Sequence, residues 1–255
     1  MSALGASGLN RQLRLKLQRP PSHRREDFFV SAANAEAVRA LDAWPAWHGG
    51  VLALTGPPGC GKTHLARAWA VHAEAVELDR DAQLDDLAGL AGRPILLEGA
   101  DGAPSEILFH LINMAGQPGG GLLLTARGAP SSWPADLPDL RSRLNALPVG
   151  ELGAPDDEIL QAVLRKLFRE RNIRPGDDVF AYLVRRMERS VPVAMAMVER
   201  LDEVADAEHR PVSRALARQI LEAEAETGDL FASRLAETGP PGDKSGSRRN
   251  GFDHE

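Results

Sequence analysis

A glycine-rich octapeptide constrains this chain more than any other feature of its sequence. Residues 56–63 read Gly-Pro-Pro-Gly-Cys-Gly-Lys-Thr and match the pattern G-x-x-x-x-G-K-[ST] at every fixed position. A short apolar run at 51–55, suited to a buried strand, precedes it, and a helix is expected at 62–73. Such a unit turns backbone N–H groups and the positive end of a helix dipole toward an anion. The chain is therefore expected to bind the phosphates of a nucleotide.

Each side chain of this loop has an expected role. Lys62 can reach the β- and γ-phosphates, and the hydroxyl of Thr63 can ligate magnesium. Cys60 is a small space-filling residue rather than a nucleophile, since no paired histidine or asparagine is evident. A chance glycine turn is the alternative, which the complete pattern disfavours. The expected phosphate-binding set is Gly56, Pro57, Pro58, Gly59, Cys60, Gly61, Lys62, Thr63 and His64.

Composition narrows the class of protein. The 255 residues are 43% hydrophobic and 26% charged, which is typical of a globular chain. With 30 basic and 36 acidic residues the net charge is −6, so an overall basic surface for nucleic acid is missing. A single cysteine excludes an intramolecular disulfide and a cysteine-built zinc site. With no apolar run near 18 residues and no signal-peptide core, we expect a soluble cytoplasmic protein without a membrane span.

The chain is expected to have four parts: a flexible basic arm (1–27), a nucleotide-binding domain (28–153), a helical domain (154–228) and a disordered tail (229–255). Six basic residues face two acidic ones in 1–30, a balance of +4 that leaves −10 elsewhere. Strands alternate with helices, which predicts a parallel sheet covered on both faces and followed by a small all-helical domain. The expected strands are 51–55, 75–78, 95–98, 121–126 and 146–149. The expected helices are 34–43, 62–73, 81–90, 105–115, 137–144, 156–170, 177–188, 193–206 and 213–226.

The acidic residue that ends the third expected strand is a candidate metal ligand. Glu98 is placed to hold magnesium together with Thr63. Gly99 stands where a second acid would orient an attacking water, and Asp101 is an alternative for that role. The sequence thus supports nucleotide binding more strongly than turnover.

Several short motifs resemble the AAA+ module of the bacterial replication initiator DnaA over about residues 27–228. They are Phe29-Val30 before Asn34, the Gly-Lys-Thr-His-Leu of 61–65, the Phe-His-Leu-Ile-Asn of 109–113, Leu124-Thr125, and the Leu-Arg-Ser-Arg of 140–143. The resemblance implies a P-loop sheet with a helical lid, bound ADP or ATP, and Mg²⁺. It places Thr125 at sensor 1, beside the γ-phosphate or attacking water. It also makes Arg143 an arginine finger acting on a neighbour's nucleotide, the alternative being an ordinary surface arginine.

The arm and the expected ends of the chain refine this resemblance. We expect no DNA-reading helix-turn-helix segment after the lid, an arrangement that resembles the Hda group of DnaA paralogues, which switch the initiator off. Residues 12–17, Gln-Leu-Arg-Leu-Lys-Leu, look like that group's motif for the DNA polymerase sliding clamp. Leu13, Leu15 and Leu17 would enter an apolar groove, and the Gln12 amide a polar subsite; an amphipathic edge strand is the alternative. The implied partners are DnaA, the clamp, DNA through the clamp, and, as an open alternative, a second copy.

Two departures bear on activity. The lid position that carries a sensor 2 arginine in the family falls on Pro192, with Arg189 nearby as a substitute, and Gly99 lacks a carboxylate. Both argue against hydrolysis by the chain itself and leave ADP or ATP open as the active ligand. The alternatives to a regulator are a stand-alone ATPase of the helicase-loader type and a DnaA-like DNA-binding protein. Trp44 and Trp47 are expected to pack on the nucleotide domain, or to stack on a purine.

Overall fold

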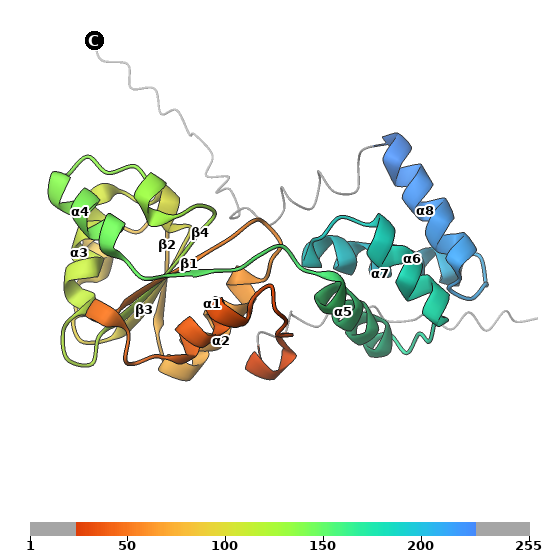
Figure 1. Ribbon diagram of the computed structural model, residues 1–255, viewed down its shortest axis with the longest axis horizontal. Helices are drawn as coiled ribbons and strands as arrows, with labels where there is room; N and C mark the ends of the chain where they lie inside the picture. The colour runs from red at the N-terminus through yellow and green to blue at the C-terminus, as the bar shows by residue number, and fades with distance from the viewer. Residues whose placement is uncertain (1–23, 228–255) are drawn as a thin grey trace, which may run out of the picture.

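The first half of the described chain is a five-stranded parallel sheet, seen in a computed structural model that describes residues 24–227 (Figure 1). The strand order is β2-β3-β4-β1-β5. The strands are β1 (Val51–Thr55), β2 (Val76–Asp79), β3 (Pro94–Glu98), β4 (Gly121–Ala126) and β5 (Val149–Glu151). All neighbouring strands pair in parallel, so their carboxyl ends meet at one edge of the sheet.

Burial explains why the apolar runs became the inner strands. Every residue of β1 and of β4 is buried, as continuous apolar sequence predicts for strands covered on both faces. Their register sets Leu54 beside Thr125. The edge strands differ, because β2 alternates between half-buried and exposed residues and β5 has a single buried position, Gly150.

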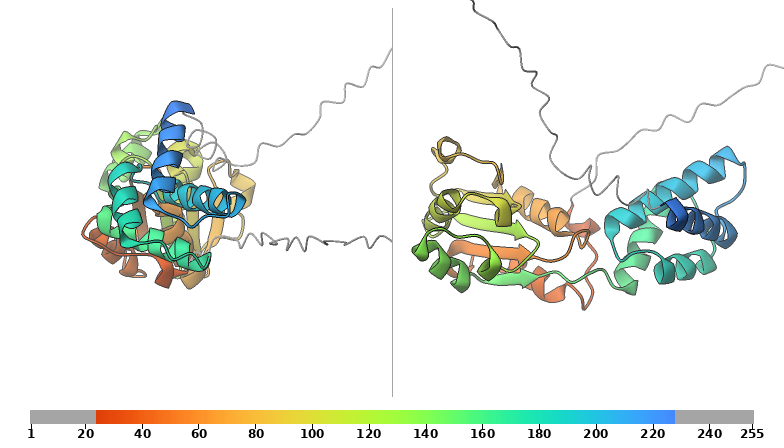
Figure 2. Two further views of the ribbon diagram at one scale, coloured as in Figure 1. Left: turned by 90° about the vertical axis from the view of Figure 1, so that its right-hand side faces the viewer. Right: turned by 90° about the horizontal axis from the view of Figure 1, so that it is seen from above.

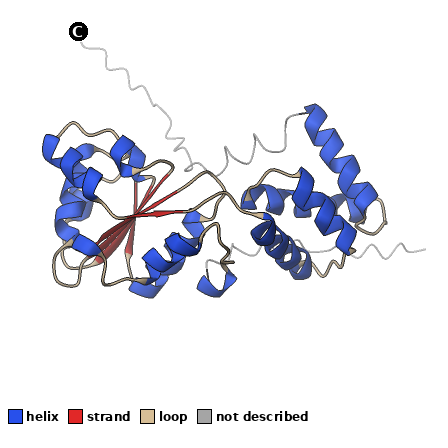
Figure 3. Cartoon of the chain, in the orientation of Figure 1, coloured by secondary structure: helices blue, strands red, loops and turns tan. Residues whose placement is uncertain are grey.

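Two pairs of helices cover the sheet (Figure 3). Helices α1 (Ala35–Asp42) and α2 (Lys62–Ala73) share a core with Leu52, Leu54, Leu96 and Leu123. Helices α3 (Ser105–Ala115) and α4 (Pro138–Ala146) share another with the alternate residues of the same strands, among them Ala53, Leu97 and Leu124. Since successive strand residues point to opposite faces, the two helix pairs lie on opposite sides of the sheet.

The second half of the described chain is a group of four helices with its own core, which stands beside the sheet (Figures 1 and 2). These are α5 (Asp157–Glu170), α6 (Asp177–Arg186), α7 (Val191–Ala207) and α8 (Arg214–Thr227). Asp156 begins the group by accepting a hydrogen bond from the N–H of Ile159, a typical N-cap. The other carboxylate oxygen of Asp156 accepts from the Ser31 hydroxyl, which ties the first lid helix to the segment before α1.

The expected fold class, a P-loop parallel sheet flanked by helices and followed by a small helical lid, is confirmed. Two local expectations were wrong. The helix expected at 81–90 is only a short 3-10 turn, η3 (Leu84–Leu87), because Gly89 takes a left-handed φ of 78° soon after it. The fifth strand begins at Val149 rather than 146, because α4 continues through Ala146 and Pro148 has no N–H for a sheet ladder.

Some expectations lie outside the part of the chain that the structure describes. Gln12, Leu13, Leu15 and Leu17 precede residue 24, and the tail follows residue 227. Within the described residues, no helix has both the length and the apolar character needed to cross a membrane.

Leu123 offers a test of the core, since its side chain is fully buried in β4 against the α1–α2 face. We expect Leu123→Ala to lower the free energy of unfolding by about 2–5 kcal/mol, the usual cost of a buried leucine truncation. Val71→Ala is the matched control, because Val71 is 77% exposed and should change stability by less than about 0.5 kcal/mol. Urea unfolding followed by tryptophan fluorescence measures both, as all four tryptophans lie in the sheet-containing half. Equal stabilities would contradict the packing described here.

Candidate functional site

The phosphate loop joins the carboxyl end of β1, between β4 and β5 in the sheet, to the first turn of α2. Gly56, Gly59 and Gly61 have φ values of 148°, 73° and 101°, a region that residues with a Cβ rarely adopt. The close approach is as restrictive as the dihedrals. A Cβ at Gly56 would lie 2.2 Å from the Leu152 carbonyl oxygen, and one at Gly61 would lie 2.9 Å from the Phe28 ring. The glycines therefore serve the packing of the loop as well as its curvature.

Lys62 lies inside the curve of this loop. Its ammonium donates hydrogen bonds to the carbonyl oxygens of Gly56 and Pro57, at 2.7 and 2.8 Å. Thr63 is exposed at the same edge, with its hydroxyl 3.5 Å from Glu98 Oε2. Cys60 is buried, and burial raises the pKa of its thiol, which fits a space-filling role rather than nucleophilic chemistry. A loop of this shape, with a cation in it and a helix N-terminus behind it, fits a polyphosphate.

The ends of the neighbouring strands bring two further candidates to the loop. Glu98 ends β3, and burial raises the pKa of its carboxyl while the nearby Arg67 guanidinium acts in the opposite direction. Thr125 is 5% exposed near the end of β4, and its hydroxyl accepts a hydrogen bond from the Gly99 N–H at 3.2 Å. Thr63 and Glu98 supply the oxygen ligands that magnesium prefers, and water and phosphate would complete its shell.

No carboxylate takes the place of Gly99. A Cβ at Gly99 would lie 3.7 Å from Arg80 Cδ, so the aliphatic stem of an arginine stands over this position. Asp101, the alternative acid, uses its carboxylate to accept a hydrogen bond from the backbone N–H of Arg127. The structure thus gives Asp101 a structural partner in the loop after β4.

A cavity of about 160 Å³ adjoins the loop, between the sheet-containing half and the lid. Its walls are mostly apolar, which suits the flat face of a nucleobase. The lining comes from the segment before α1 (Asp27, Phe28, Phe29, Asn34), from the loop and α2 (Cys60, Gly61, His64), and from α5 and α7 (Ile159, Val163, Lys166, Leu167, Glu170, Val191, Met195). This cavity was not predicted from the sequence, although residues 159, 163 and 167 show apolar helical spacing that could have indicated one of its walls.

The segment that closes this cavity is held by polar contacts. Lys166 of α5 pairs with Asp27 at 2.7 Å, and both side chains are largely buried. His64 Nε2 lies 2.9 Å from the Arg24 carbonyl oxygen, and its ring contacts that of Phe28. The short helix η1 (Arg25–Asp27) is thereby placed against both α2 and the lid.

The start of α7 meets the phosphate loop directly. The N–H of Val191 donates to the Gly59 carbonyl oxygen at 3.0 Å, and a Cβ at Gly59 would lie 2.2 Å from Ser190 Oγ and 3.2 Å from Pro192 Cδ. Pro192 thus lies against the loop without bringing a cation to it. Arg189, the considered substitute, points elsewhere: its guanidinium pairs with Asp157 and donates to the Pro155 carbonyl oxygen.

Arg143 lies away from this cluster. It is exposed on α4, with its guanidinium carbon 5.3 Å above the centroid of the Phe109 ring on α3. Figures 1 and 2 show α4 on the far side of the sheet from the lid helices. His110 and Asn113 are also exposed on α3, rather than buried as packing residues would be. The structure therefore does not bring Arg143 together with the phosphate loop of its own chain.

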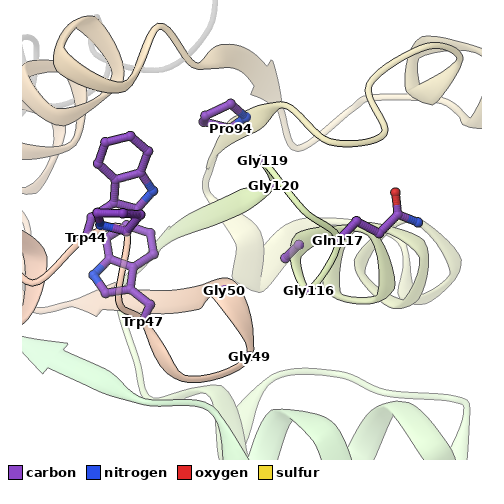
Figure 4. Close-up of a pocket in the computed structure, with 11 residues that line it drawn as sticks. Trp44, Trp47, Gly49, Gly50, Pro94, Gly116, Gln117, Gly119 and Gly120 are labelled. Atoms are coloured by element: carbon purple, nitrogen blue, oxygen red, sulfur yellow. The ribbon is translucent and has the colours of Figure 1, made fainter.

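A second cavity, of about 650 Å³, opens at the opposite edge of the sheet, where β1, β3 and β4 begin (Figure 4). Trp44 and Trp47 form one wall, glycines form much of the rest, and the side chain of Gln117 points away from the tryptophans. Trp47 also stacks on Trp69 at 5.1 Å. The expectation that these tryptophans pack on the sheet-containing half agrees with the structure. The alternative, in which these tryptophans stack on a purine, does not agree with the structure. A base there would lie at the opposite end of the strands from the phosphate loop.

Fold and site together define a phosphate-loop α/β protein with a helical lid, the AAA+ architecture. No family model matches the chain. It is 29% identical over 139 residues to the chromosomal replication initiator protein DnaA of Thermomicrobium roseum, a match that covers 54% of this chain and 28% of that protein. The chain thus spans about a quarter of this curated relative.

Solved structures agree with this match. The crystal structure of domain III of the Thermotoga maritima replication initiation protein DnaA superposes with a TM-score of 0.67 at 19% identity, covering 80% of this chain and 97% of that one. The replication initiator DnaA bound to AMPPCP and single-stranded DNA gives 0.60 at 17% identity, covering 74% and 69%. The chain thus resembles DnaA in sequence over about half of its length and has the fold of DnaA domain III.

Gly59 provides a test of the contact between loop and lid. We expect Gly59→Ala to destabilise the protein by more than the roughly 1–2 kcal/mol of a left-handed residue, because the new Cβ also collides with Ser190. Gly49→Ala is the matched control, since Gly49 has a similar φ of 64° and open space around it. Chemical denaturation of both variants measures the difference. Equal losses of stability in the two variants would show that the lid does not contact the loop in solution.

Proposed function

We propose that this protein binds ADP or ATP and acts as a negative regulator of chromosomal replication initiation. In this proposal it docks on the DNA-loaded sliding clamp and promotes ATP hydrolysis by DnaA. The observation that carries the proposal is the combination of a complete phosphate loop with an exposed arginine, Arg143, on a surface remote from that loop. The relationship to DnaA supports a role in replication.

Nucleotide binding rests on three groups of residues around one edge of the sheet. The loop, with Lys62 inside it, fits the phosphates, and the cavity beside Phe28 and Val163 fits a base. Thr63 and Glu98 would hold a magnesium ion, which supplies positive charge to the phosphates when bound. Related DnaA structures hold the ATP analogue AMPPCP, which is consistent with this assignment.

Action on a partner fits the surface better than turnover by the chain itself. Gly99 brings no carboxylate to the site, Asp101 is engaged with a backbone N–H, and Pro192 brings no cation. A finger that acts in trans has to be exposed so that it can reach another molecule's phosphates. Arg143 is exposed, and the cation–π contact with Phe109 places its guanidinium at the surface of α3 and α4.

Docking on the clamp is assigned to residues 12–17 on their sequence alone. An extended peptide with alternate leucines suits an apolar groove. The described chain begins at Arg24, whose carbonyl oxygen lies beside His64, near the candidate nucleotide site.

Arg143→Ala is expected to abolish the stimulation of ATP hydrolysis by ATP-bound DnaA in a reaction with DNA-loaded clamp. Fingers acting in trans contribute factors of about 10³–10⁵ in comparable systems, so the rate should fall to that of DnaA alone. Arg218→Ala on α8 is the control, because Arg218 is an exposed arginine remote from α4. Full stimulation by the Arg143 variant would refute the finger role.

The clamp assignment is tested separately by the paired substitution Gln12→Ala/Leu13→Ala. We expect the variant to lose capture by immobilised sliding clamp, since both the polar and the first apolar anchor are removed. A control changes Arg14→Ala, which lies between the anchors and should leave binding largely intact. Capture of the paired variant at the wild-type level would assign the arm another role.

A further inference from the structure

Arg67 stands between the phosphate-loop helix and the acidic ends of two strands. It follows Thr63 by one helical turn on α2 and so projects from the same side of the helix. Its Nε lies 3.2 Å from Glu98 Oε1 and 3.6 Å from Glu77 Oε2. The arginine therefore contacts carboxylates from both β3 and β2.

The two oxygens of Glu98 have different neighbours. Oε2 lies 3.5 Å from the hydroxyl of Thr63, the pair that would hold magnesium, whereas Oε1 faces Arg67. The Glu98 side chain is 24% exposed and that of Arg67 is 41% exposed, but the two facing atoms, Arg67 Nε and Glu98 Oε1, are themselves buried. Because a guanidinium stays protonated in proteins, a metal ion that approaches Glu98 always meets a resident cation.

The charged residues around Glu98 show how far Arg67 offsets the local negative charge. Asp79 is the register partner of Glu98 across β2 and β3, and Glu77 lies two residues before it. The three carboxylates bring negative charge to this side of the sheet, and Arg67 offsets two of them by direct contact. Arg80 is also close, but it covers Gly99 with its aliphatic stem and pairs with Asp81.

We propose that Arg67 is a built-in counter-cation for Glu98, so that this protein holds its nucleotide with little dependence on magnesium. The inference rests on the nucleotide binding proposed above. In this view the arginine offsets the negative charge of Glu98 and so weakens the metal site there, which leaves the loop and Lys62 to hold the phosphates. Arg67 acts as a positioning residue, since it contacts Glu98 rather than the phosphates.

The test compares the affinity for a fluorescent ADP analogue in excess EDTA and in excess magnesium. For wild type we expect nearly the same dissociation constant in both buffers. For Arg67→Gln we expect magnesium to improve affinity by about tenfold, because the cation that repels a metal at Glu98 is removed, and one nearby charge in a partly aqueous dielectric has an effect of this order. Arg80→Gln removes an equal charge nearby without a contact to Glu98 and should behave as wild type.

Binding of Mn²⁺ to the protein–ADP complex, followed by water-proton relaxation, gives a second readout. Arg67→Gln should bind Mn²⁺ more tightly than wild type, and the double variant Arg67→Gln/Glu98→Gln should lose that gain. A wild-type protein that needs magnesium for tight ADP binding would overturn the inference without any variant. An Arg67 variant with wild-type metal response would do the same. Failure to bind ADP in either buffer would instead remove the proposed function, and the inference with it.

Discussion

The three glycines of the phosphate loop are the constraint on which the rest of the structure depends. Each one lacks a side chain where another part of the molecule comes close: Gly56 beside Leu152, Gly61 beside Phe28, and Gly59 beside Ser190. The loop is thus in contact with the segment after β5, with the segment before α1 and with the lid at once. The same glycines give the backbone the freedom that phosphate binding requires and leave room for three separate segments to pack against the loop. The glycine pattern therefore explains how these segments pack together as well as which ligand is expected.

Much of the fold followed from local sequence because the strong signals are local. Continuous apolar runs marked β1, β3 and β4, and the loop pattern fixed the start of α2 at Lys62. The failures also have local causes, since Gly89 ends the 81–90 segment early and Pro148 delays β5. What sequence reasoning missed is non-local. The base cavity joins residues near 28, 60 and 163, and the Arg67–Glu98 pair joins a helix to a strand 31 residues later. The spacing of residues along the chain does not indicate such contacts, because they depend on the order of the strands in the sheet.

Charge at the candidate site favours holding a nucleotide over hydrolysing it. Lys62 and Arg67 bring positive charge to the loop and to Glu98, while Gly99 and Pro192 leave out the acid and the cation expected for turnover. Burial raises the pKa of Glu98, so its environment is already unfavourable to a bare carboxylate, and the arginine partly compensates. Arg143 is exposed on α4, away from the phosphate loop, with its guanidinium over the Phe109 ring. These features support the proposal that the protein acts on the nucleotide of a partner molecule.

The two edge strands of the sheet, β2 and β5, affect how this protein can associate with another protein. Strand β2 presents Glu77 and Asp79 to solvent, and β5 is three residues long with α1 packed beside it. Charged and short edge strands offer a poor template for strand addition, and proteins use them to prevent aggregation through their sheets. Association with another protein, including a second copy of this chain, is therefore steered away from backbone pairing. It is left to helical surfaces such as the one that carries Arg143, where side chains rather than peptide groups select the partner.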